Sequence, residues 1–184
     1  MTFSFHALRR LALLGALASL VAAAACTPTF NWRDVPVGDG GLVALLPCKA
    51  DRGSREVALD GRAATVTVAG CQAGGATFAV AVAEADNPVQ ARAWLASWSA
   101  GAQGAGGGKP CLKPAKVPHA APMPEALELD AGCAAAPQPG HPQMLWFAQA
   151  LGGKVLLYQA TMVDGPPEAE VWRTFVEGLR LPGR

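Results

Sequence analysis

The sequence predicts an α+β fold, with an antiparallel sheet of meander and hairpin strands, two helices packed on it and two disulfides. Three observations support this class. Short apolar or alternating segments flank two-residue turns that contain glycine, which is typical of β-hairpins. Two other segments place their apolar residues three and four positions apart, which is typical of amphipathic helices. The elements follow one another as strands, helix, strands and helix, the order of an antiparallel α+β domain.

The first strands are expected early in the folded part of the chain. Residues 42–46 are a short apolar run that is typical of a buried strand. Residues 55–59 and 62–69 lie on either side of Asp60 and Gly61. An Asp-Gly pair favours the positive φ angles of a two-residue turn, so these two segments are expected to form a hairpin.

A further strand is expected over residues 77–83. Its larger apolar side chains, Phe78, Val80 and Val82, alternate with alanines. Alternation puts the two sets on opposite faces of a sheet. The alanine face is therefore expected to let a helix approach closely.

A helix is expected to begin over residues 87–90. Asn87 can cap the first turn, Pro88 fits the first helical position, and Gln90 completes a pattern like the capping box. The glycine-rich residues 101–108 end the helix. Its apolar face is formed by Ala91, Trp94, Leu95 and Trp98.

The second half of the sheet is expected after a proline-rich segment. Residues 111–124 contain four prolines and are expected to run extended along the surface. Residues 126–131 are expected to form a short strand. A second proline-rich loop follows over residues 134–142.

The clearest hairpin signal comes next. Residues 144–150 and 155–163 are apolar segments joined around Gly152 and Gly153. A two-residue loop sets the register of the paired strands. The expected cross-strand partners are Phe147 with Tyr158 and Trp146 with Gln159.

A second helix is expected near the C-terminus and is opened by residues 164–167. Glu168 and Glu170 lie near its N-terminus, where the helix dipole favours negative charge. Pro182 and Gly183 follow its end. Its apolar face is formed by Trp172, Phe175, Val176 and Leu179.

The N-terminal segment predicts export. Arg9 and Arg10 form a basic stub, residues 11–21 form an apolar run too short for a membrane span, and small residues precede Cys26. This arrangement resembles a bacterial lipoprotein signal. The resemblance implies that residues 1–25 are removed and that Cys26 is lipidated by acyl chains such as palmitate. Ordinary signal cleavage without lipidation and an uncleaved anchor are the alternatives.

Cysteine parity favours lipidation. If Cys26 carries lipid, four cysteines remain, and an even number can pair completely in an oxidising compartment. We favour the pairs Cys48–Cys71 and Cys111–Cys133, because each pair closes a short local segment. The two other pairings of the same four cysteines stay open.

The expected organisation is a signal over residues 1–25, a tether over 26–41 and a single periplasmic domain over 42–184. Phe30 and Trp32 in the tether are expected to dock on the domain, and the alternative is a partner-binding motif near the membrane. In the resembled lipoproteins the residue after the lipidated cysteine helps sorting. Thr27 is not aspartate, which implies the outer membrane, on its periplasmic face.

The sequence contains no catalytic, metal or cofactor motif that we recognise. Without Arg9 and Arg10, 13 Lys and Arg remain against 14 Asp and Glu, so nothing indicates a nucleic-acid partner. No cofactor and no metal site are expected. The residues considered for chemistry are each expected to be solvent-facing or to serve turns and caps: Ser54, Ser97, Ser99, His119, His141, Asp60, Asp130 and Asp164.

Two resemblances and three functional interpretations remain. The order of elements over residues 42–181 loosely resembles the PsbP-like fold, whose members include lumenal photosystem assembly proteins, and the export signal resembles that of short proteobacterial lipoproteins. Fold likeness implies little about function.

The leading interpretation is a membrane-tethered, non-enzymatic periplasmic lipoprotein with a binding, scaffold or envelope-assembly role and an envelope protein as partner. The alternatives are a carrier of a small apolar ligand, bound near Trp94 and Trp98, and an enzyme of unrecognised type.

Overall fold

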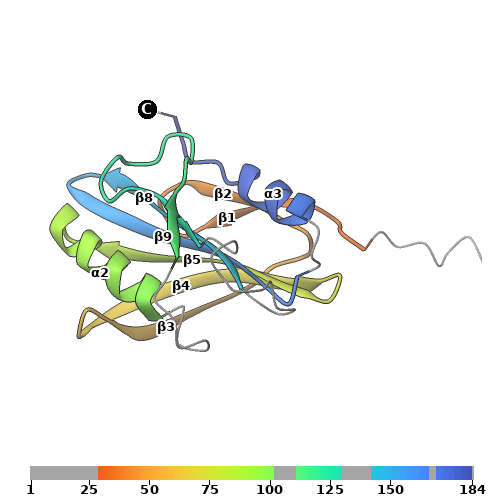
Figure 1. Ribbon diagram of the computed structural model, residues 1–184, viewed down its shortest axis with the longest axis horizontal. Helices are drawn as coiled ribbons and strands as arrows, with labels where there is room; N and C mark the ends of the chain where they lie inside the picture. The colour runs from red at the N-terminus through yellow and green to blue at the C-terminus, as the bar shows by residue number, and fades with distance from the viewer. Residues whose placement is uncertain (1–28, 102–110, 130–141, 166–168, 184) are drawn as a thin grey trace, which may run out of the picture.

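The computed structural model describes residues 29–101, 111–129, 142–165 and 169–183. Within them a seven-stranded antiparallel sheet has the order β3-β4-β5-β9-β8-β7-β6, and a separate small sheet pairs β1 with β2 (Figure 1). The elements are β1 (Arg33–Val37), β2 (Leu42–Leu46), β3 (Asp51–Leu59), β4 (Arg62–Ala73), β5 (Ala76–Ala85), α2 (Pro88–Gly101), β6 (Leu112–Pro114), β7 (Leu127–Leu129), β8 (Gln143–Leu151), β9 (Lys154–Val163) and α3 (Ala169–Glu177). The predicted α+β class, an antiparallel sheet with two helices, is confirmed.

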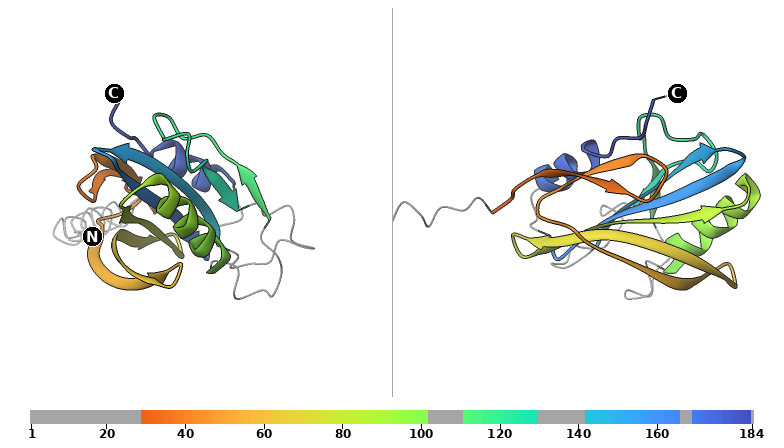
Figure 2. Two further views of the ribbon diagram at one scale, coloured as in Figure 1. Left: turned by 90° about the vertical axis from the view of Figure 1, so that its left-hand side faces the viewer. Right: turned by 180° about the vertical axis from the view of Figure 1, so that it is seen from behind.

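The large sheet is covered on both faces (Figures 1 and 2). We call the side packed against β1, β2 and α3 the hairpin face; its core includes Phe78, Phe147 and Phe175. We call the side packed against α2 the helix face; its core includes Trp94 and Trp146. The two clusters meet only through the sheet itself, so the fold has three layers.

Both glycine-containing hairpins form as predicted. Leu59 pairs with Arg62 across a turn in which both central residues have positive φ, 51° at Asp60 and 72° at Gly61. In the second hairpin Phe147 lies opposite Tyr158, and their rings stack with centroids 5.0 Å apart. Trp146 lies opposite Gln159, as expected.

The expected tether contains a strand. Arg33–Val37 forms β1 and pairs along its whole length with β2, so the folded domain begins before Leu42. Phe30 and Trp32 pack on the domain as expected, with ring centroids 6.3 and 6.1 Å from that of Phe78. These aromatic contacts and the β1–β2 ladder explain why this proline-containing segment is ordered.

The C-terminal segment completes the layer that contains β1, β2 and α3. After α3, Arg180 forms an antiparallel bridge to Val43, with N···O distances of 2.9 and 2.8 Å in the two directions. The guanidinium of Arg180 also contacts the carboxylate of Asp34 at 2.6 Å. The small β1–β2 sheet is thereby extended by the end of the chain.

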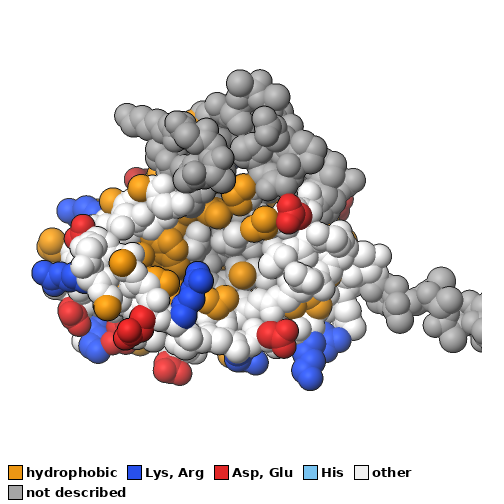
Figure 3. All heavy atoms as spheres, turned by 90° about the horizontal axis from the view of Figure 1, so that it is seen from below, with side chains coloured by type: hydrophobic (Ala, Val, Ile, Leu, Met, Phe, Trp, Pro, Cys, Tyr) orange, Lys and Arg blue, Asp and Glu red, His pale blue; other side chains and the backbone are white. Residues whose placement is uncertain are grey.

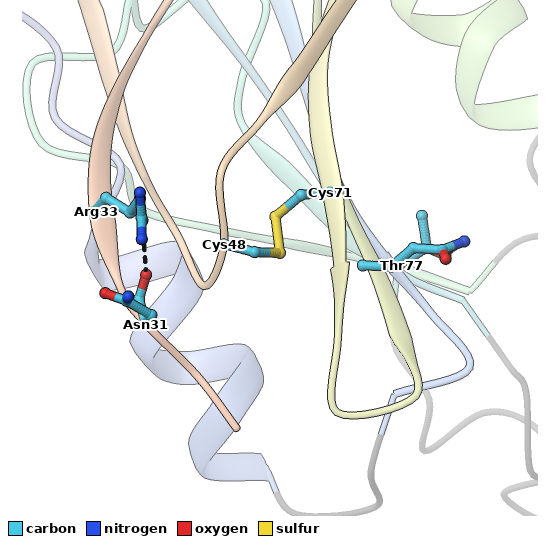
Figure 4. The surroundings of a disulfide bond; sticks show 6 residues. Asn31, Arg33, Cys48, Cys71 and Thr77 are labelled. Atoms are coloured by element: carbon cyan, nitrogen blue, oxygen red, sulfur yellow. Dashed lines mark hydrogen bonds between the residues drawn. A yellow bond between two sulfur atoms is a disulfide. The ribbon is translucent and has the colours of Figure 1, made fainter. Parts of the chain in front are cut away.

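The predicted pair Cys48–Cys71 is confirmed. The bridge joins the segment after β2 to β4, with Cα atoms 5.9 Å apart (Figure 4). Of the second predicted pair, Cys111 is described and Cys133 lies outside the described residues. The two-disulfide pattern is therefore shown for one bridge, and Cys111–Cys133 stays a prediction.

Helix α2 begins as the capping pattern predicts. Asn87 Oδ1 accepts a hydrogen bond from the backbone N–H of Gln90 at 2.9 Å. Gln90 Oε1 accepts one from the backbone N–H of Asp86 at 2.6 Å. The Asn87 side chain thus satisfies one N-terminal donor that the helix cannot satisfy internally, and the Gln90 side chain binds the backbone just before the helix. No helix among the described residues has the length and apolar character to cross a membrane.

Candidate functional site

A groove runs beside α2, between the helix and the short strands β6 and β7 that end the large sheet. Its volume is about 310 Å³. The helix contributes five of its lining residues, and each short strand contributes its first residue. The groove is lined by Arg92, Leu95, Ala96, Ser99, Ala100, Leu112 and Leu127.

The helical periodicity explains this lining. The five helix residues are spaced at i, i+3, i+4, i+7 and i+8, which is one stripe along a helix. Ala96 and Ala100 are exposed, and their small side chains leave the space that a longer side chain would fill. Leu95, Leu112 and Leu127 make the walls apolar. Among the described lining residues, Arg92 alone carries a charge.

Trp94 and Trp98, which the sequence indicates chiefly as core residues and alternatively as ligand-binding residues, lie on the neighbouring stripe of α2. Trp94 is buried against the sheet, in the same cluster as Trp146, and it does not line the groove. Trp98 is half-buried against that cluster and does not line the groove either. Leu95, the residue after Trp94, touches both the core and the groove. The sequence did contain a signal for the groove. It is a second stripe of apolar and small residues along the helix, formed by Leu95, Ala96, Ser99 and Ala100.

The helix face contains two buried indoles without a hydrogen-bond partner among the described residues. They are the N–H groups of Trp94 and Trp146. Trp172, near the start of α3, differs, because its indole N–H donates to Glu128 Oε1 at 2.8 Å. Lys113 Nζ lies 3.4 Å from the other oxygen of the same carboxylate. The indole N–H of Trp172 on the hairpin face is therefore hydrogen-bonded, whereas those of Trp94 and Trp146 on the helix face have no described partner.

Hydrophobic side chains also reach the surface on the underside of the molecule, where they gather over its middle and charged side chains lie around them (Figure 3). Several apolar residues of the helix face are only partly buried, and they are Val57, Val68, Ala81, Trp98, Leu112, Leu127, Leu129 and Met144. Among the described residues, part of this face of the sheet is thus incompletely covered.

A buried polar network lies at the hairpin face. Tyr158 donates to Gln149 Oε1 at 3.0 Å, and Gln149 Nε2 donates to the carbonyl of Gly40 at 3.0 Å. Gly40 has no room for a side chain, because an added Cβ would lie 2.1 Å from Leu156 Cδ1. Burial raises the pKa of Tyr158 well above its ordinary value. This network holds the β1–β2 turn against β8 and β9.

The residues considered as candidates for catalysis or metal binding lie in different parts of the fold. Ser97 Oγ accepts a hydrogen bond from the backbone N–H of Asp60 at 3.0 Å. Ser54 is exposed and bonds across to β4, to the carbonyl of Val66 and the hydroxyl of Thr67. Asp164, like Asp60, has positive φ in a turn.

Two expectations about exposure have different outcomes. His119 is exposed, as expected, with a φ of 63°. The expectation that Ser99 faces solvent is wrong: it is 4% exposed, because it lies on the groove side of α2, and its hydroxyl donates to the carbonyl of Ala96 at 3.2 Å. Asp130 and His141 lie outside the described residues. Within the part of the chain that is described, no three His, Cys, Asp or Glu side chains group as metal ligands would.

No protein-family model matches this sequence, and a comparison with curated proteins finds no match.

Proposed function

We propose that this chain is an outer-membrane lipoprotein of the bacterial envelope, anchored through Cys26 and facing the periplasm, and that its domain binds a partner rather than catalysing a reaction. The signal-like residues 1–25 support export. The Cys48–Cys71 bridge supports it independently, because such bonds form and persist in oxidising compartments. The second predicted bridge, Cys111–Cys133, belongs to the same proposal.

The observation that carries the binding role is the apolar groove beside α2. The described chain begins next to the β4–β5 turn, since a side chain added at Gly74 would meet Phe30 and Thr29. This start of the described chain lies at the end of the domain opposite α2 (Figure 1). An anchor at Cys26 would therefore present the groove away from the membrane. This orientation favours an envelope protein as partner.

In-cell photo-crosslinking tests the protein partner. A photoreactive residue replaces Ala100, which is exposed and lines the groove, or Ala63, which is exposed on β4. We expect a discrete crosslinked species from position 100 and none from position 63. The same species from both positions, or none from either, would count against a partner that uses the groove.

The anchor has its own test. We expect Cys26→Ser to lose the acyl mass and to leave the outer-membrane fraction, because the thioether site is gone. Cys48→Ser serves as the control for removal of a cysteine and should keep both the acyl mass and the membrane location. Unchanged mass and fractionation of Cys26→Ser would refute lipidation.

A carrier of a small apolar ligand is the second candidate, and the size of the groove favours it. A volume of about 310 Å³ is at the lower end of the range of small-molecule sites, roughly 300–1,000 Å³. The groove would hold the ligand with its alanines and leucines, while Trp94 supports the helix from beneath. Native mass spectrometry of the purified protein should show a bound small molecule that Ala100→Phe displaces and Ala63→Phe retains.

A further inference from the structure

The charge of the groove indicates which class of ligand it takes. Arg92 is the charged member of a lining that is otherwise alanine, leucine and serine. Its guanidinium lies 3.8 Å from the thioether sulfur of Met123, which is a weak acceptor. The ion pairs among the described residues do not include Arg92. A cation beside an apolar groove is complementary to an anion that carries an apolar chain.

The carboxylate on the neighbouring strand does not neutralise this cation. Glu128 lies between the lining strand residue Leu127 and Leu129, and successive strand residues point to opposite faces. Its oxygens are bound to Trp172 of α3 and to Lys113. Since α3 packs on the hairpin face, Glu128 points away from the groove. Among the described residues the groove therefore has a positive charge at Arg92 and no negative charge in its lining.

The described chain begins far from the groove. Cys26 would lie only three residues before Thr29, and Thr29 lies near the β4–β5 turn. The ten residues of β5 span about 30 Å between that turn and the start of α2. The described chain also begins at the end of the molecule away from α2 (Figures 1 and 2). A ligand from elsewhere is therefore favoured over the protein's own acyl chains.

We propose that the groove binds a free fatty acid, with its alkyl chain against Leu95, Leu112 and Leu127 and its carboxylate on the guanidinium of Arg92. This inference rests on the carrier function proposed above and names its ligand class. A planar guanidinium suits a carboxylate because two parallel N–H donors can meet its two oxygens. The alkyl chain gains from leaving water.

The test is equilibrium dialysis of the full-length protein in lipid nanodiscs with labelled decanoate and, separately, labelled decanol, with empty nanodiscs subtracted. We expect the wild type to bind decanoate more tightly than decanol. Arg92→Gln should weaken decanoate binding about tenfold, because a charged hydrogen bond is lost, and should leave decanol binding unchanged. Arg92→Lys should recover part of the preference for the acid.

Filling the groove with a larger side chain tests whether the groove is a ligand site at all, independently of which class of ligand it binds. Ala100→Phe should abolish the binding of both probes, and Ala63→Phe, a matched change on β4, should affect neither. If Ala100→Phe abolishes both but wild type binds decanol as well as decanoate, the groove remains a ligand site and the fatty acid is the wrong ligand. If neither probe responds to Ala100→Phe, the carrier function fails as well. Circular dichroism of each variant confirms that it is folded.

Discussion

The two faces of the sheet differ in how completely they are covered. The hairpin face is covered by β1, β2 and α3, and its aromatic side chains contact one another edge to face or stacked, as Phe78 does with Phe175 at 5.5 Å. Among the described residues, the helix face is covered by α2 and by Ala121 of the segment before β7, keeps several apolar residues partly exposed, and contains two indole N–H groups without a described partner. Stability is therefore expected to reside in the first face, and room for a ligand in the second.

The largest expected effect tests the packing of the hairpin face. Phe175 is completely buried and contacts Phe78 and Trp172. We expect Phe175→Ala to lower the free energy of unfolding by about 3–5 kcal/mol, because it removes buried apolar surface and leaves a cavity. Trp98→Ala, on the helix face, should cost less, because Trp98 is only half-buried. Denaturant unfolding measures both, and equal losses would contradict the contrast between the faces.

The disulfide Cys48–Cys71 is expected to make the next largest contribution to the free energy of unfolding, on the side of the hairpin face. It joins residues 23 positions apart, and closing a loop of that size stabilises a protein by about 3 kcal/mol in the chain-entropy model. The double variant Cys48→Ser, Cys71→Ser should lose that amount in denaturant unfolding without reductant. A loss under about 1 kcal/mol would show that the native contacts hold this segment without the bridge.

The indoles allow a matched comparison of the two faces. Trp172→Phe removes the hydrogen bond to the carboxylate of Glu128, and we expect a loss of about 1.5–3 kcal/mol. Trp94→Phe removes an indole N–H that has no described partner, so its cost should come from lost packing alone and be smaller. Thermal and denaturant unfolding measure the difference. A larger loss for Trp94→Phe would mean that its N–H is satisfied in solution.

The smallest expected effect concerns alkaline pH. Tyr158 is the single tyrosine of the chain, and burial raises its pKa. The folded state therefore holds the phenol proton more tightly than the unfolded state, whose tyrosine titrates near about pH 10. This contribution is complete below about pH 10 and is lost as the pH rises further. Tyrosinate absorbance should appear only at higher pH than in the denatured protein, and Tyr158→Phe should remove this part of the alkaline destabilisation.

Much of the fold follows from local sequence. Asp60-Gly61 and Gly152-Gly153 adopt the positive φ angles that tight turns need, so both hairpins and the register of the second are as predicted. Asn87 pairs one of the first donors of α2, and Gln90 pairs the N–H of Asp86 just before the helix. The predicted pair Cys48–Cys71 is also formed, and it joins the segment after β2 to a position within β4.

Other features need contacts between distant residues. β1 is a strand because β2 and the aromatic core lie beside it, whereas its own sequence, with Pro36, is typical of a tether. Ser99 is buried because its side of α2 lies along the groove. The sequence of α2 predicts its apolar face correctly, because Ala91, Trp94, Leu95 and Trp98 belong to the helix-face cluster or pack against it. It does not tell which side of the helix lines the groove, because that side is set by the distant strands β6 and β7.

The sequence by itself determined the turns, the helix starts and the alternation that gives each strand two faces, because these depend on the φ preferences and hydrogen bonds of residues close in the chain. Tertiary structure alone decided the strand order, in which Ala85 of β5 meets Val155 of β9, and the position of β6 and β7 beside α2. Those arrangements are selected by the joint burial of apolar surface from remote segments. The groove exists because two short strands at the end of the sheet and one helix meet without a large side chain among the described residues to fill the space between them.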